Sequence, residues 1–231
     1  KFEHEKRFEN FEEANKIYEK VKNEAFGIIS DIEESVYSLN PLPPFDTTDL
    51  QEEAYNVYGF KPEYTLEIAE KLYLKGYISY PRSGSQKLKN INPLPILSAL
   101  MQLNEYKDYI EEILKQGIKI TEGKKDDPAH PAIIPTNEIP KYLEDDEKKL
   151  YDLIVRRFLV CLSDKALRKS IKIKVNVGEI EFLNTFHFTI KDGWLKIYRK
   201  FLDLEETKIE NIKRFQKVKI LKIKLDKEKT K

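Results

Sequence analysis

The spacing of the apolar residues changes once along the chain, near Lys169, and this change restricts the fold more than any other feature. Over residues 145–164 the apolar side chains recur at helical spacing, which is typical of a helix with a buried face. From Ile171 to Val177 they alternate strictly with polar residues, which is typical of a strand with one solvated face. The same alternation occurs at residues 180–183, 186–190 and 218–225. The sequence therefore predicts a helical middle followed by a β-rich tail.

Shorter periodic segments fill the rest of the chain. We expect helices over residues 10–23, 48–57, 63–74, 95–103 and 106–116. We expect strands over residues 26–37 and 77–81, a loop over 123–140 and a turn at 191–193.

Because strands are expected at both ends of the chain, we predict an α+β fold in which a helical domain interrupts a β domain. The predicted helical domain is residues 45–168, and the split β domain is residues 1–44 with 169–231. The stiff stretch Pro41–Pro44 marks the first boundary.

The net charge of +1 conceals an uneven distribution. The chain of 231 residues has 41 Lys and Arg against 40 Asp and Glu. Residues 166–231 hold 18 basic and 9 acidic residues, a net charge of +9, which leaves −8 for the remainder. The alternation places the lysines of the tail on a solvated strand face, and such a basic surface suits an anionic partner.

Composition excludes several classes of protein. Hydrophobic residues make up 40% of the chain, so we expect a packed core and not global disorder. A single cysteine, Cys161, excludes an intramolecular disulfide and a multi-cysteine metal site. No apolar run approaches the roughly 20 residues of a membrane helix, and no secretory leader is visible. The high charged fraction of 35%, with one Met and one Cys, is typical of thermophile proteins.

Motifs for nucleotide binding, zinc proteolysis and serine hydrolysis are missing. The chain has no GxGxxG, Walker, HExxH or GxSxG sequence and no Asp-x-Asp pair. His4, His130 and His187 lie far apart in the sequence, so we do not expect a histidine metal site. Because the sequence starts at Lys1 and its one methionine is Met101, we expect a piece of a longer chain.

The segment from Tyr77 to Ser85 carries a different chemistry. A phenol oxygen with a pKa of about 10 can attack a phosphodiester and later leave again. Tyr80 is followed by Pro81, which stiffens the backbone, and by Arg82, which can hold a phosphate with two hydrogen bonds. Ser83 and Ser85 can donate to phosphate oxygens. The chain has 13 tyrosines, so residue type alone does not single out Tyr80.

Five segments resemble, in family order, the motifs of type IA DNA topoisomerases. They are Pro43–Ala54 (PPFDTTDLQEEA), Thr65–Tyr73 (TLEIAEKLY), Gly76–Ser85 (GYISYPRSGS), Asp127–Thr136 (DPAHPAIIPT) and Leu150–Leu159 (LYDLIVRRFL). The later Gly193-Trp194-Leu195 is similar to the family's GWL, and the Pro81 version of the tyrosine motif is like that of archaeal members. The resemblance covers nearly the whole chain but only the middle of the family's length.

The resemblance implies roles for individual residues. Tyr80 attacks one DNA strand and forms a 5′-phosphotyrosine link, another strand passes through the gap, and the break is resealed without ATP. Arg82 binds phosphate beside Tyr80, and His130 lies near the active site and contacts the DNA backbone. Further candidates for DNA contact are Gln51, Ser83, Ser85 and Arg157. Of the pair Arg156-Arg157, we expect one arginine to be structural at the helix surface and the other to face DNA or an acidic partner.

The resemblance also implies an architecture and its partners. A winged-helix-like tyrosine domain is expected inside a β-rich arch that acts as a hinge, corresponding to domains II and III of the family. The family binds Mg²⁺ in a Toprim domain with a catalytic Glu and an Asp-x-Asp pair, and this sequence contains no counterpart, so we expect the chain alone not to cleave DNA. The expected partners are single-stranded DNA and the remaining domains of the parent chain, in the cytoplasm with the nucleoid.

Three departures from the family pattern stand near the motifs. Glu70 replaces the usual Gln, Ser83-Gly84 replaces the usual Thr-Asp, and Ile134 stands where many bacterial members have Arg. Two alternatives remain open: the topoisomerase part of a reverse gyrase, and a single-stranded-DNA-binding module without catalysis. The sequence does not decide between relaxation, decatenation and reverse gyration.

Overall fold

The structure is a computed structural model that describes residues 1–226, and the chain forms two compact units. The first unit, which we call the β unit, comprises Lys1–Tyr37, Leu167–Ile190 and, of the described residues, 205–226. The second, which we call the helical unit, comprises Ser38–Ala166 and Lys191–Leu204. Each unit is thus assembled from stretches that are separated in the sequence.

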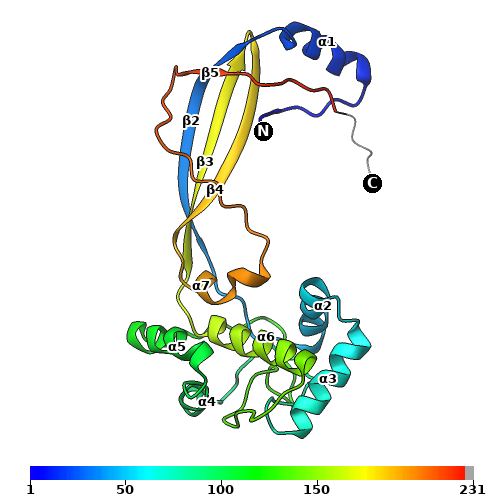
Figure 1. The fold of residues 1–231 in the computed structure, drawn as a ribbon, viewed down its shortest axis with the longest axis vertical. Coiled ribbons are helices and arrows are strands. Elements are labelled where there is room, and N and C mark those ends of the chain that lie inside the picture. Colours follow the sequence, from blue (N-terminus) through cyan, green and yellow to red (C-terminus); the bar gives the residue numbers. More distant parts are fainter. Residues whose placement is uncertain (227–231) are drawn as a thin grey trace. The chain divides into compact units, whose positions relative to one another are not determined.

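The β unit is built on a curled five-stranded sheet with the strand order β1-β4-β3-β2-β5. Three long strands lie side by side in it: β2 (Phe26–Leu39), β3 (Ala166–Val177) and β4 (Ile180–Lys191) (Figure 1). Two short strands pair antiparallel with the outer long ones, β1 (Glu3–His4) with β4 and β5 (Lys217–Lys219) with β2.

Alternate residues of β3 form the core of the β unit. Ile171, Ile173, Val175 and Val177 are buried, as their alternation predicts, and they cluster with Ile29 of β2 and Val21. Val21 is the last residue of α1 (Phe11–Val21), which begins where the Asn10 side chain accepts a hydrogen bond of 2.8 Å from the Glu13 amide.

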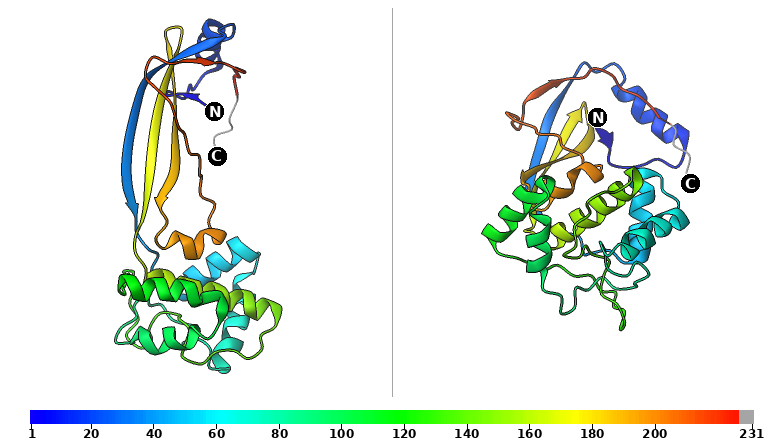
Figure 2. Two further views of the ribbon diagram at one scale, coloured as in Figure 1. Left: turned by 60° about the vertical axis from the view of Figure 1, so that its left-hand side comes forward. Right: turned by 60° about the horizontal axis from the view of Figure 1, so that its bottom comes forward.

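The helical unit is organised around α6 (Asp145–Cys161), which is buried along most of its length. The helices that pack against it are α2 (Thr47–Tyr58), α3 (Pro62–Leu74), α5 (Asn104–Gln116) and α7 (Leu195–Tyr198) (Figure 2). The unit also contains α4 (Pro93–Leu100), which packs on α5, and a 3₁₀ turn, η1 (Arg199–Phe201). At the start of α6, Glu144 and Glu147 form a capping box, in which each side chain accepts from the other residue's amide.

The structure confirms the six predicted helices, with boundaries that shift by at most three residues. The mixture of helices with an antiparallel sheet agrees with the predicted α+β class. The two strands predicted at 180–190 are one continuous strand, β4, and the short elements β1, α7 and η1 have no counterpart in the prediction.

The prediction of a strand over residues 218–225 is wrong beyond Lys219. β5 pairs with Phe26–Ile28 at the start of β2, and the next residue pairs once more, where the Ile220 amide donates to the carbonyl of Ala25. The chain before Ala25 turns out of α1, so it provides no further strand for residues 221–225 to pair with. Alternation alone therefore does not make a strand when a partner is missing.

The predicted strand over residues 77–81 is likewise reduced to a single bridge. Ile78 pairs only with Pro135, because neighbouring amides bond elsewhere: the Tyr77 amide donates to the Leu72 carbonyl and the Ile134 amide to the Ser79 hydroxyl.

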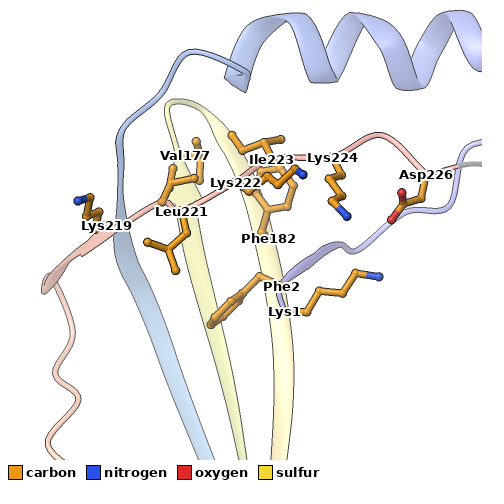
Figure 3. A pocket seen from close by; sticks show the side chains of 11 residues that line it. Lys1, Phe2, Val177, Phe182, Lys219, Leu221, Lys222, Ile223, Lys224 and Asp226 are labelled. Atoms are coloured by element: carbon orange, nitrogen blue, oxygen red, sulfur yellow. The ribbon is translucent and has the colours of Figure 1, made fainter.

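A hollow of about 640 Å³ lies in the β unit beside the β3–β4 hairpin (Figure 3). Phe2, Val177 and Phe182 provide apolar surface there. Lysines from the end of β5 and the segment after it stand around the hollow: Lys219, Lys222 and Lys224. None of the predicted site residues lines this hollow.

Candidate active site

The backbone that leads to Tyr80 is fixed by the loop of residues 123–140. α3 ends at Leu74, and Gly76, with a φ of +80°, turns the chain out of the helix. The Ser79 amide donates to the Ile134 carbonyl at 2.9 Å. The Ser79 hydroxyl donates to the Ala132 carbonyl at 2.8 Å and accepts from the Ile134 amide at 2.9 Å. Three hydrogen bonds therefore hold Ser79 in place directly before Tyr80.

The ring of Tyr80 is half-buried and contacts two other rings. Its centroid is 4.5 Å from that of His130 and 5.4 Å from that of Tyr73, which meets it edge-on. Tyr73 comes from α3 and His130 from the 123–140 loop. The structure thus brings together the predicted nucleophile and the predicted histidine, which are fifty positions apart.

A carboxylate that the sequence prediction did not assign to the site holds Arg82. The Glu70 Oε1 atom accepts from Arg82 Nε at 2.8 Å and from Arg82 Nη2 at 2.5 Å. The side chains are 56% exposed for Arg82 and 43% for Glu70, so both groups remain within reach of a ligand. The departure from the family's Gln at position 70 was the one signal in the sequence that pointed to this contact.

The loop after Tyr80 is anchored through its carbonyl groups. Thr47, at the start of α2, donates its hydroxyl to the Pro81 carbonyl at 2.7 Å and its amide to the Ser83 carbonyl at 2.9 Å. These bonds hold the backbone on both sides of Arg82, so the position of its Cα atom is set by α2.

Both predicted serines turn inward. The Ser83 hydroxyl donates to the Pro131 carbonyl at 2.7 Å and accepts from the Ser85 amide at 3.1 Å. The Ser85 hydroxyl accepts from the Lys87 amide at 3.1 Å. Ser83 is 1% exposed and Ser85 is 0% exposed, so in this conformation their hydroxyls support the loop and are not presented to a ligand.

Asp127 connects the loop after Tyr80 to His130. One carboxylate oxygen accepts from the amides of Ala129 and His130, at 2.8 and 3.4 Å, and the other accepts from the Gly84 amide at 3.3 Å. These backbone hydrogen bonds, with that of Ala129 the largest influence, lower the pKa of Asp127. Asp127 opens the DPAHPAIIPT motif, but only the fold reveals that it positions His130.

A shallow pocket of about 360 Å³ lies beside the Arg82 loop. It is lined by Asp46, Thr47, Thr48, Leu66, Arg82, Ser83, Gly84 and Lys125. Lys125 Nζ lies 2.5 Å from an Asp46 oxygen and 3.2 Å from an Asp49 oxygen, and hydrogen bonds to both carboxylates raise the pKa of Lys125. Both cations of the pocket are therefore paired with carboxylates.

The structure does not bring Gln51 or Arg157 into contact with Tyr80. The Gln51 amide donates to the Pro62 carbonyl at 3.0 Å and joins α2 to the start of α3. Arg157 is 6% exposed, and it donates to the Pro43 carbonyl at 2.6 Å and to Glu53 at 2.7 Å. Its guanidinium also lies over the Phe45 ring, 4.4 Å from the centroid.

Arg156 is also buried in the helical unit. It is 9% exposed, pairs with Asp152 at 2.8 Å and donates to the Ile197 carbonyl at 3.0 Å. Both arginines of the pair therefore serve the interior of the helical unit in this conformation. The catalytic and DNA-binding roles of the candidate residues stay predictions.

Neither a metal site nor a membrane span is found in the described part of the chain. Among residues 1–226, no group of three or more His, Cys, Asp or Glu side chains is arranged to hold a metal ion. Over the same residues, no helix has the length and apolar character needed to cross a bilayer.

The fold and the motifs around Tyr80 place the chain in the type IA DNA topoisomerase family. A family model described as DNA topoisomerase matches residues 1–231, and the chain belongs to this family of type IA enzymes. It is 42% identical over 224 residues to DNA topoisomerase 1 of Pyrococcus horikoshii, an alignment that covers 95% of this chain and 32% of that relative. It is 39% identical over 230 residues to DNA topoisomerase 1 of Methanocaldococcus jannaschii, with 98% and 30% covered.

A solved structure shows the same likeness. Full-length topoisomerase I from Thermotoga maritima is similar with a TM-score of 0.68 and 26% identity, over 93% of this chain and 36% of that chain. The chain thus spans about a third of the length of the proteins it matches. The archaeal character predicted from Pro81 agrees with the two archaeal relatives.

Proposed function

We propose that this chain is the part of a type IA DNA topoisomerase that carries the nucleophilic tyrosine. The observation that supports this most is the contact between the rings of Tyr80 and His130. The hydrogen bonds of Ser79 fix the backbone directly before Tyr80, and Arg82 follows Tyr80 by two residues. Within residues 1–226, no protein group forms a hydrogen bond with the Tyr80 hydroxyl, which leaves it available to a ligand.

The proposed reaction exchanges one phosphate ester for another. The Tyr80 oxygen attacks the phosphorus of a single DNA strand, the phenol loses its proton, and the bond from phosphorus to the 3′-oxygen breaks. The 3′-oxygen leaves as a hydroxyl, and the 5′-phosphate stays on Tyr80. Arg82 offsets the charge on the phosphate, and His130 contacts the backbone beside it. Reversal reseals the strand after another has passed, without ATP, because the phosphotyrosine bond keeps the ester energy.

The proposal needs a Mg²⁺ site in addition to the residues around Tyr80. No metal-binding group is found among residues 1–226, so the described residues do not fit a Mg²⁺ ion. We assign Mg²⁺ to a Toprim domain elsewhere in the parent protein, with single-stranded DNA as the substrate and the nucleoid as the place of action. The β unit is proposed as the arch and the helical unit as the tyrosine domain.

The test is a chimera that supplies the missing domains. This chain replaces the aligned 224 residues of the Pyrococcus horikoshii enzyme, and the purified chimera is mixed with Mg²⁺ and a single-stranded oligonucleotide labelled at its 3′ end. We expect a denaturant-resistant labelled adduct that disappears in Tyr80→Phe. Tyr73→Phe is the matched control, because it removes the hydroxyl of the ring that touches Tyr80, and it is expected to keep the adduct.

Two results count against the proposal. An adduct that survives Tyr80→Phe shows that another residue is the nucleophile. A chimera that binds the oligonucleotide but forms no adduct supports a binding module without catalysis.

A further inference from the structure

Glu70 lies on α3 between a residue that lines the pocket beside the Arg82 loop and a residue that contacts the Tyr80 ring. Leu66, Glu70 and Tyr73 follow helical spacing on α3, so they share one face of that helix. Leu66 lines the pocket, Tyr73 contacts the Tyr80 ring, and Glu70 between them pairs with Arg82. The position of Glu70 is therefore set by the same helix that supports the proposed nucleophile.

The charges around the pocket do not favour a phosphate. Its two cations, Arg82 and Lys125, face three carboxylates, those of Glu70, Asp46 and Asp49. An incoming phosphate meets no unpaired cation among these five groups. Binding to Arg82 thus requires the phosphate either to displace Glu70 or to lie close to its negative charge.

The ion pair uses only part of the guanidinium. Glu70 takes the edge formed by Nε and Nη2 through a single oxygen, while Nη1 remains outside the pair. Because both side chains are partly exposed, water screens the pair and makes it weak enough to break. Arg82 is therefore oriented by Glu70 and is still able to exchange that partner for a phosphate.

We infer that Glu70 is a positioning residue that weakens the hold of Arg82 on the DNA backbone and so favours release of the strand. The inference rests on the proposed function, in which Arg82 contacts phosphate. Glutamine has the same shape and still accepts a hydrogen bond from Arg82, but it carries no charge. Glu70→Gln thus removes the opposing charge and leaves the helix surface intact.

The test measures binding of a fluorescent single-stranded oligonucleotide to the 231-residue chain at several salt concentrations. We expect Glu70→Gln to bind roughly three- to tenfold more tightly near physiological salt, since one nearby negative charge is removed. We expect the log–log dependence on salt to steepen by about 0.7, the value for one additional phosphate contact on a single strand. A residue that only supports the fold does not change this slope.

A matched control separates the effect of the charge beside Arg82 from the effect of the net charge of the chain. Glu67 lies on the same helix and pairs with Lys71 at 2.8 Å, so Glu67→Gln changes the net charge equally without touching Arg82. The double variant with Arg82→Gln shows whether Glu70 acts through Arg82, because the effect of Glu70→Gln is then expected to vanish.

The outcomes distinguish failure of the proposed contact between Arg82 and phosphate from failure of the inference about Glu70. If the unaltered chain does not bind the oligonucleotide, or if Arg82→Gln leaves binding unchanged, the proposed contact of Arg82 is wrong and the inference falls with it. If Arg82→Gln weakens binding but Glu70→Gln behaves like Glu67→Gln, the proposed contact stands and the inference about Glu70 is overturned.

Discussion

Replacement of Arg157 by methionine tests whether this arginine serves the interior or a ligand. Its side chain is 7% exposed and that of its partner Glu53 is 20% exposed. Removal of one partner from a buried ion pair costs about 3–5 kcal/mol. Glu53 retains some contact with water, which reduces that cost, while the Pro43 carbonyl loses a donor, which adds about 1 kcal/mol. We therefore expect Arg157→Met to lower the free energy of unfolding by about 3–4 kcal/mol.

Trp194 provides the assay for this loss. It is the chain's one tryptophan, it is 2% exposed, and its indole nitrogen donates to the Leu39 carbonyl at 3.0 Å, within the helical unit. Its fluorescence therefore reports the unfolding of that unit. In a chain of this size the expected loss lowers the melting temperature by roughly 6–16 °C.

Two further measurements test whether Arg157 stabilises the interior of the helical unit. If Glu53 is destabilised by the loss of its partner, Glu53→Gln should recover at least about 1 kcal/mol in the Arg157→Met background, as a double-mutant cycle measures. A variant that melts within about 2 °C of the unaltered chain but binds single-stranded DNA more weakly refutes the reasoning. That result would place Arg157 on the DNA, as the sequence predicts.

Two other predictions concern Glu147 and Gly193. Burial raises the pKa of Glu147, but hydrogen bonds from Lys75 and from a backbone amide, with the Lys75 charge, outweigh it and leave this pKa below 4.5. The resulting stabilisation is fully present well above the unfolded pKa and is lost as the pH falls through the lower folded pKa. The difference in unfolding free energy between the unaltered chain and Glu147→Gln should therefore narrow as the pH falls below 4.5. A difference that stays constant contradicts this. Gly193 has a φ of +50°, and an added Cβ would lie 2.3 Å from the Lys165 carbonyl oxygen, so Gly193→Ala should lower the free energy of unfolding by roughly 2–4 kcal/mol in chemical denaturation. Gly84→Ala, where the added Cβ meets no atom within 4 Å, should change it little, and equal effects would show that the close approach is not the cause.

Local patterns predicted most of the secondary structure. The period of α6 and the alternation of β3 act between neighbouring residues, and each element forms where its pattern lies. The pattern failed at residues 220–225, where a strand also needs a partner that α1 and its following turn do not provide. Strand pairing joins distant parts of the chain, so a segment's own sequence cannot guarantee it.

The residues of the candidate site were also predicted only in part from local sequence. The sequence pointed to Tyr80, Arg82 and His130 through their motifs, and the fold brings the Tyr80 and His130 rings together. It also predicted ligand contacts for Ser83 and Arg157, which the fold turns toward carbonyl groups of the chain itself. Serine and arginine donate equally well to a phosphate or to a carbonyl, so residue type does not reveal which partner is present.

The sequence by itself determined the helical middle, the alternating tail, the likeness to type IA topoisomerases and the loop that carries Tyr80. Only the tertiary structure decided which donors remain available to a ligand. Ser83 meets a carbonyl 48 positions away, Arg157 meets one 114 positions away, and Arg82 meets a carboxylate on the preceding helix. A hydrogen bond acts over about 3 Å of space whatever the separation along the chain, so these partners exist only once packing has brought the segments together.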